Sequence, residues 1–182
     1  MRAARGTFSC RLSRRSCSTL RDMDLLRTLH GYQGIPFLLF VTPFAFTTFI
    51  LFVWSVVVAA RGRPDRGFRA WLGLTWVTFL LPALTGLILA LNGGKVASAV
   101  DIGGGRTRYG LPYDPTQEFM HLLYPGFALL TLLLLGPLLR AQLPLLSERR
   151  RLWILPVATL FLYGCAYMAG FVAVFPGSTP GE

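Results

Sequence analysis

Two histidines are the residues of this chain whose type and position best suit ligand chemistry. His30 and His121 are the only histidines in the sequence, and each lies near the start of a long apolar stretch. Imidazoles on two facing helices can serve as axial ligands of a haem iron. His30 and His121 are therefore candidate ligands of a haem or of a metal ion. The alternative is that both side chains simply face water at the membrane surface.

Two carboxylates close to His121 extend this candidate site. Glu118 precedes His121 by three residues, so the two side chains share one face of a helix. Asp114 lies one turn further back if the helix reaches across Pro115. Nitrogen and oxygen donors of this kind suit a divalent metal ion. The candidate metal ligands are therefore His30, His121, Glu118 and Asp114.

Four apolar stretches have to position these residues. They run from about Ile35 to Ala60, Trp71 to Leu91, Phe119 to Leu139 and Leu152 to Phe175. Each has about 20 residues or more, which is enough to cross roughly 30 Å of hydrocarbon as a helix. Lipid offers no partner to exposed backbone groups, so the stretches must be helical. We predict an all-α, polytopic integral membrane protein in which residues 23–182 form a four-helix transmembrane bundle.

The charge distribution agrees with a membrane protein. Only 14% of the 182 residues are charged, and the mean hydropathy is +0.54. The net charge of +10 comes from arginines in short segments beside the apolar stretches, where phospholipid headgroups explain them. No folded basic face is predicted that could carry nucleic-acid binding. We expect membrane lipids as partners and no nucleic acid.

The arginine-rich segments also predict an orientation. Residues 61–70 and 140–151 lie on one side of the membrane, and the positive-inside rule places that side in the cytoplasm. The loop 92–118 and both termini then lie on the opposite side. At the cytoplasmic interface, four residues are predicted to act as anchors. They are Arg69, Trp71, Arg151 and Trp153.

The first 22 residues differ from the rest of the chain. Residues 1–22 are rich in arginine and serine, and their only acid is Asp22. We expect this head to be disordered or absent from the mature protein. It resembles a mitochondrial transit peptide in composition, or it is translated upstream sequence with Met23 as the true start.

A weak internal repeat suggests two helical hairpins in parallel orientation. The second and fourth stretches open with Arg69-Ala-Trp71 and Arg151-Leu-Trp153. The first and third stretches each have a histidine near the start. Parallel repeats of this kind occur in membrane proteins.

No motif in the sequence identifies a reaction. The apolar stretches contain no nucleophile–base pair, so an enzyme is not indicated. The leading interpretation is a non-catalytic accessory or scaffold subunit of a membrane complex, partnered by another membrane protein or by a second copy of itself. One alternative is a redox subunit that binds haem or metal through His30 and His121. Another is a permease for a neutral or lipid-like molecule.

Overall fold

The structure is a computed structural model that describes residues 25–26, 30, 42–140 and 147–177. Four of its helices are long and apolar enough to cross a membrane. These are α2 (Pro43–Arg61), α3 (Arg66–Leu91), α4 (Gln117–Leu139) and α5 (Glu148–Val172), with the short 3₁₀ helix η2 (Ala97–Ala99) between α3 and α4. The prediction of an all-α, multi-pass membrane protein built as a four-helix bundle is confirmed.

Local capping explains where the helices begin and end. The Thr42 side chain accepts a hydrogen bond from the backbone N–H of Ala45 at the start of α2, and Asp65 caps α3 in the same way. Gly62 ends α2 in a left-handed conformation with φ +75°, which favours glycine. Helix α3 therefore begins before the predicted apolar stretch, because its polar first turn is stabilised by a cap rather than by hydropathy.

Some predictions lie outside the described residues. These are the basic head 1–22, the start at Met23, and residues 35–41 of the first predicted span.

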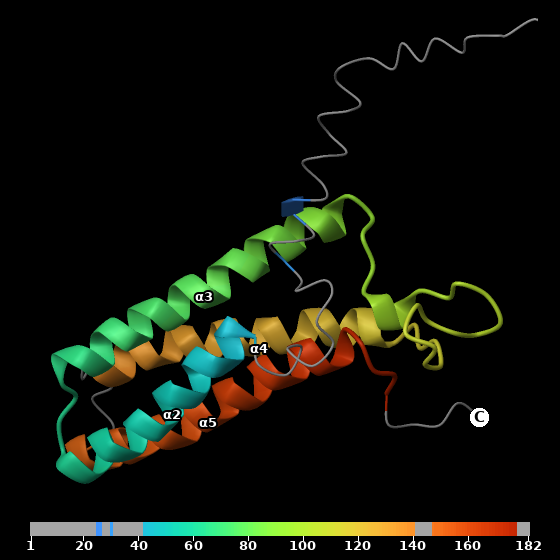
Figure 1. Cartoon of the computed structure of the whole chain (residues 1–182). Coiled ribbons are helices and arrows are strands. Elements are labelled where there is room, and N and C mark those ends of the chain that lie inside the picture. The colour runs from blue at the N-terminus through green and yellow to red at the C-terminus, as the bar shows by residue number, and fades with distance from the viewer. Residues whose placement is uncertain (1–24, 27–29, 31–41, 141–146, 178–182) are drawn as a thin grey trace, which may run out of the picture.

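Three of the helices form the compact part of the bundle. Helix α5 packs along both α2 and α4, whereas α3 packs mainly against α2 and has only sparse contact with α4 and α5. Figure 1 shows α3 diverging from the other helices toward its C-terminal end. We call the end where α3 ends, α4 begins and α5 ends the long-loop end. The opposite end, where α2 ends and α5 begins, is called the arginine end.

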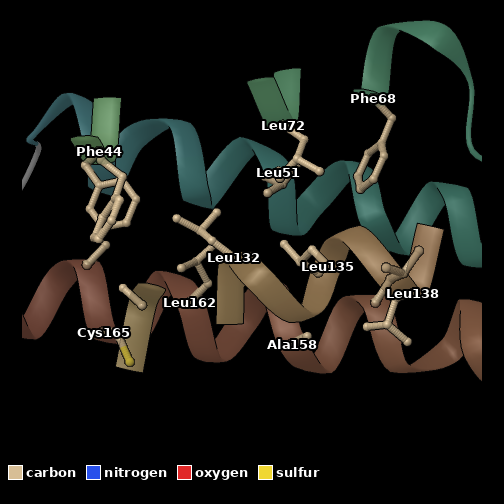
Figure 2. Close-up of a cluster of buried hydrophobic side chains, with 14 of the residues drawn as sticks. Phe44, Leu51, Phe68, Leu72, Leu132, Leu135, Leu138, Ala158, Leu162 and Cys165 are labelled. Atoms are coloured by element: carbon tan, nitrogen blue, oxygen red, sulfur yellow. The ribbon is translucent and has the colours of Figure 1, made fainter. Parts of the chain in front are cut away.

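Leucines fill the space between α2, α4 and α5. Leu51, Leu135, Leu155 and Leu162 are fully buried, and Phe68 of α3 joins them close to the arginine end. Figure 2 shows these apolar side chains meeting between the helices. Many other large apolar side chains of all four helices are exposed. That pattern is expected of a bundle whose outer surface faces lipid.

Hydroxyl groups add polar contacts inside the apolar bundle. The hydroxyls of Thr75 and Thr159 bond carbonyls of their own helices, as threonines in helices commonly do. Two further bonds cross between helices. Ser55 of α2 meets Thr159 of α5 at 2.8 Å, and Thr47 of α2 meets Thr78 of α3 at 2.8 Å.

Removal of one inter-helical hydroxyl tests this packing. In Thr159→Val the shape of the side chain is kept but the bond to Ser55 is lost. We expect a loss of about 1 kcal/mol in the free energy of unfolding, measured by titrating mixed micelles with a denaturing detergent. Thr75→Val is the matched control, because Thr75 is equally buried but bonds only Trp71 of its own helix. Equal losses in the two variants would contradict a role for the inter-helical bond.

Candidate functional site

The structure brings the two histidines together. The ring centres of His30 and His121 are 5.9 Å apart, and the ring planes are nearly perpendicular at 85°. The two side chains come from different parts of the chain, since His30 precedes α2 and His121 lies in the second turn of α4. Both are half-buried rather than fully exposed. The predicted pairing of His30 with His121 is therefore present in the fold.

Each histidine is oriented by a carbonyl oxygen of a neighbouring helix. His30 Nδ1 lies 2.8 Å from the carbonyl of Pro82 in α3, and His121 Nδ1 lies 2.9 Å from the carbonyl of Ala169 in α5. A carbonyl oxygen can only accept a hydrogen bond, so Nδ1 carries the proton in both rings. When such a ring is neutral, its lone pair lies on Nε2. A histidine in this state is prepared to bind a metal through Nε2.

A glycine of α3 makes room for His30. A Cβ added at Gly86 would lie 2.4 Å from Cε1 and 2.8 Å from Nδ1 of the His30 ring. Contacts that short do not occur, so any larger residue at this position would displace the imidazole. Gly86 is four residues after Pro82 and therefore lies on the same face of α3. Pro82 therefore bonds the His30 ring, and Gly86 leaves the space that the ring occupies.

The two predicted carboxylate ligands have other partners. Glu118 accepts a hydrogen bond from the backbone N–H of Val96 at 3.2 Å. Asp114 accepts hydrogen bonds from Gly177 and from two neighbouring residues. Within the described part of the chain, no group of three or more His, Cys, Asp or Glu residues is placed to hold a metal ion. Of the four candidate ligands, the structure thus pairs only the histidines.

Asp114 connects three segments at the long-loop end. Its carboxylate accepts a bond of 2.7 Å from the Gly177 N–H of the C-terminal segment and one of 2.7 Å from the Gln117 side chain in α4. The Asp114 N–H donates to the carbonyl of Ser98 in the loop. Partial burial raises the pKa of Asp114, but hydrogen bonds from Thr116, Gly177 and Gln117 outweigh it and lower the pKa to about 2. The carboxylate is therefore ionised at all physiological pH values.

The loop between α3 and α4 has a defined conformation. Asp101 accepts hydrogen bonds from the backbone N–H groups of Gly103, Gly105 and Arg106. Gly104 and Gly105 have φ values of +67° and +72°, which side chains other than glycine rarely adopt. The glycine triplet therefore closes a tight turn around one carboxylate.

The four predicted interface anchors divide into two kinds. Arg69 is exposed and Trp153 keeps 53% of its surface accessible, as an anchor requires. Trp71 instead donates its indole N–H to the carbonyl of Thr47 at 2.9 Å. Arg151 is buried and donates to the carbonyl of Leu138 at the end of α4.

Sequence reasoning did not single out three residues that shape the site. Gly86 and the carbonyls of Pro82 and Ala169 hold the rings, but a carbonyl carries no residue-specific signal. Gly86 does carry one, because a small residue one turn after a mid-span proline marks a place where something approaches the helix closely.

Comparison with known proteins identifies no relative. The chain matches no protein-family model, no curated protein and no solved structure. The function therefore has to be argued from the histidine pair itself.

The Asp114 contacts give a first prediction for this end of the molecule. Asp114→Asn removes the negative charge that its donors share, so we expect the Gly177 and Thr116 amides to exchange with deuterium at least about tenfold faster at neutral pH. In the unmodified protein the stabilisation is complete above the ordinary carboxyl pKa near 4. It is lost as the pH falls toward 2, because the folded-state pKa is the lower one.

Asp101→Asn is the matched control. Asp101 accepts three backbone hydrogen bonds, but none from the C-terminal segment. We expect the Gly103 and Arg106 amides to exchange faster and the Gly177 amide to exchange at an unchanged rate. Unchanged exchange at Gly177 in Asp114→Asn would show that the carboxylate does not hold the C-terminal segment.

Proposed function

We propose that this chain is a small membrane subunit that binds one haem between His30 and His121. The observation that carries the proposal is the pair of neighbouring imidazoles, 5.9 Å apart between ring centres with nearly perpendicular planes, each with Nδ1 bonded to a carbonyl. A metal–nitrogen bond of about 2 Å on either side of one ion would separate two opposed ring centres by roughly 6 Å. The observed separation suits a single iron ligated from both faces.

The number of ligands favours haem over a bare metal ion. A haem brings four equatorial nitrogens, so two histidines complete its coordination. A zinc, copper or non-haem iron ion needs further protein ligands. In the described residues Asp114 and Glu118 are engaged elsewhere, and no third ligand joins the histidines.

The role of such a subunit follows from its size. Apart from the loop between α3 and α4, most of the described chain is spanning helix, so the bundle is the main place for a ligand. A haem in this bundle would exchange electrons with a partner, another membrane protein or a second copy of the chain. This proposal unites the accessory-subunit and redox interpretations. No observation favours the permease, which stays a prediction from the sequence.

A haem titration tests the proposal. The full chain, purified in mild detergent and titrated with haemin, should take up one equivalent with a sharp Soret band of a six-coordinate low-spin iron. His30→Ala and His121→Ala should each lose that spectrum, because one axial ligand is missing. Folding of each variant is checked by circular dichroism and size-exclusion chromatography. Equal haemin spectra in both variants and the unmodified protein would refute the site.

Two glycine variants sharpen the same test. Gly86→Ala introduces a Cβ into the His30 ring, so it should weaken haem binding by about tenfold or more through displacement of one ligand. Gly73→Ala in the same helix is the control, because a Cβ there meets no atom within 4 Å. An equal loss of haem binding in both variants would point to a less stable helix rather than to displacement of His30.

We also propose an orientation in which the arginine end faces the cytoplasm. The exposed arginines of residues 61–69 and 149–150 support it through the positive-inside rule. The histidine pair, the loop 92–118 and both termini then belong to the opposite side.

Single cysteines report this orientation directly. With Cys10, Cys17 and Cys165 replaced by serine, Ile102→Cys in the long loop should react with a membrane-impermeant maleimide in intact cells. Pro64→Cys at the arginine end should react only after the cells are broken. The reverse pattern would overturn the orientation without affecting the haem proposal.

A further inference from the structure

The arginine end carries positive charge that the protein itself does not neutralise. The described residues there include seven exposed arginines, namely Arg61, Arg63, Arg66, Arg69, Arg140, Arg149 and Arg150. The two acids nearby already have partners. Asp65 caps α3 through the Phe68 N–H at 2.6 Å, and Glu148 lies 3.9 Å from the Arg151 guanidinium. This end therefore attracts anions.

A hollow opens between the last turn of α2 and the first turns of α5. Its volume is about 480 Å³. The α2 wall is made of Ala59, Ala60 and Gly62, and the α5 wall of Glu148, Arg149, Leu152 and Trp153. The small side chains of α2 leave the space open, and the Trp153 ring borders it. The hollow thus combines apolar side chains with polar surface, and Arg149 and Glu148 are its two charged lining residues.

The hollow lies on the side of α5 that faces away from α4. Arg151 contacts the carbonyl of Leu138 and so marks the side of α5 that meets α4. Arg149 and Trp153 are four residues apart and share a face, which is turned about 160–200° from Arg151 at about 100° per residue. This face is therefore directed to the membrane surroundings of the bundle.

The first turn of α5 adds hydrogen-bond donors. Its N-cap residue, Ser147, makes no side-chain capping bond, and the first N–H groups of an α-helix have no partner within the helix, so they can donate to an anion. Arg149 lies in this same turn. A phosphate at the mouth of the hollow would meet both the guanidinium and the helix terminus.

We propose that this hollow is a binding site for one anionic phospholipid. The phosphate would lie at Arg149 and the start of α5, and an acyl chain would follow Ala59, Ala60 and Trp153 along the bundle. The location supports a lipid, because the hollow joins two helices that span the membrane at the level where their polar ends meet headgroups. Apolar side chains beside Arg149 match a phospholipid better than a free phosphate, and the other charged lining residue, Glu148, lies 3.9 Å from the Arg151 guanidinium. The proposal is independent of the haem site.

Native mass spectrometry of the full chain in detergent tests the site. Phosphatidylglycerol should be retained as one bound molecule more strongly than phosphatidylcholine with the same acyl chains. Arg149→Gln should weaken phosphatidylglycerol retention about fivefold, whereas Arg69→Gln, an equal loss of charge at an exposed position outside the hollow, should leave it unchanged. Ala60→Leu should also weaken retention by filling the space while keeping every charge.

Three outcomes would overturn the proposal. Equal losses in Arg149→Gln and Arg69→Gln would show diffuse attraction to the whole arginine end. Equal retention of the two lipids would show that the headgroup charge is not recognised. Displacement of the lipid by millimolar inorganic phosphate would assign the site to a soluble anion.

Discussion

A polar group buried in hydrocarbon without a hydrogen-bond partner costs several kcal/mol. This cost determines how the polar side chains inside the bundle are bonded. In the described part of the chain, every buried side-chain nitrogen or oxygen has a partner. Many of those partners are backbone carbonyls, which accept from Thr75, Thr159, Arg151 and both histidines. A carbonyl already bonded within a helix can accept a second hydrogen bond. The helices therefore satisfy inserted polar groups without any buried acid.

The same constraint acts on the two histidines. Each ring has two nitrogens, and Nδ1 donates a hydrogen bond to a helix carbonyl, so Nε2 is the nitrogen that a ligand would reach. His30 is bonded to α3 and His121 to α5, and these helices otherwise have only sparse contact. An iron bonded to both rings would join the diverging helix to the rest of the bundle, so haem binding and the position of α3 would be coupled.

Hydropathy alone predicted the spans well, because helices in lipid need little more than length and apolar composition. The pairing of His30 with His121 was also accessible from the sequence, since both lie at matching ends of their hairpins. The carboxylates were harder to place. Glu118 and His121 do share a helix, but the sequence does not reveal that Val96 returns to bond Glu118, or that Gly177 returns to bond Asp114. Those contacts depend on how a loop and a terminus fold back, which spacing within one helix cannot show.

The two Arg-x-Trp sequences are a second case in which the sequence alone did not predict the contacts. Both copies were predicted to anchor at the interface, yet Arg69 is exposed while Arg151 is buried, and Trp153 is exposed while Trp71 bonds α2. The reason is the number of neighbours each helix has. Helix α5 packs between α2 and α4, so one of its first-turn arginines must face a helix, and it donates to the carbonyl of Leu138. Helix α3 packs mainly on α2, so its arginine stays outside and its tryptophan turns inward. Similar sequence at two helix starts therefore produces different contacts, because the packing around each start decides which side chain is buried.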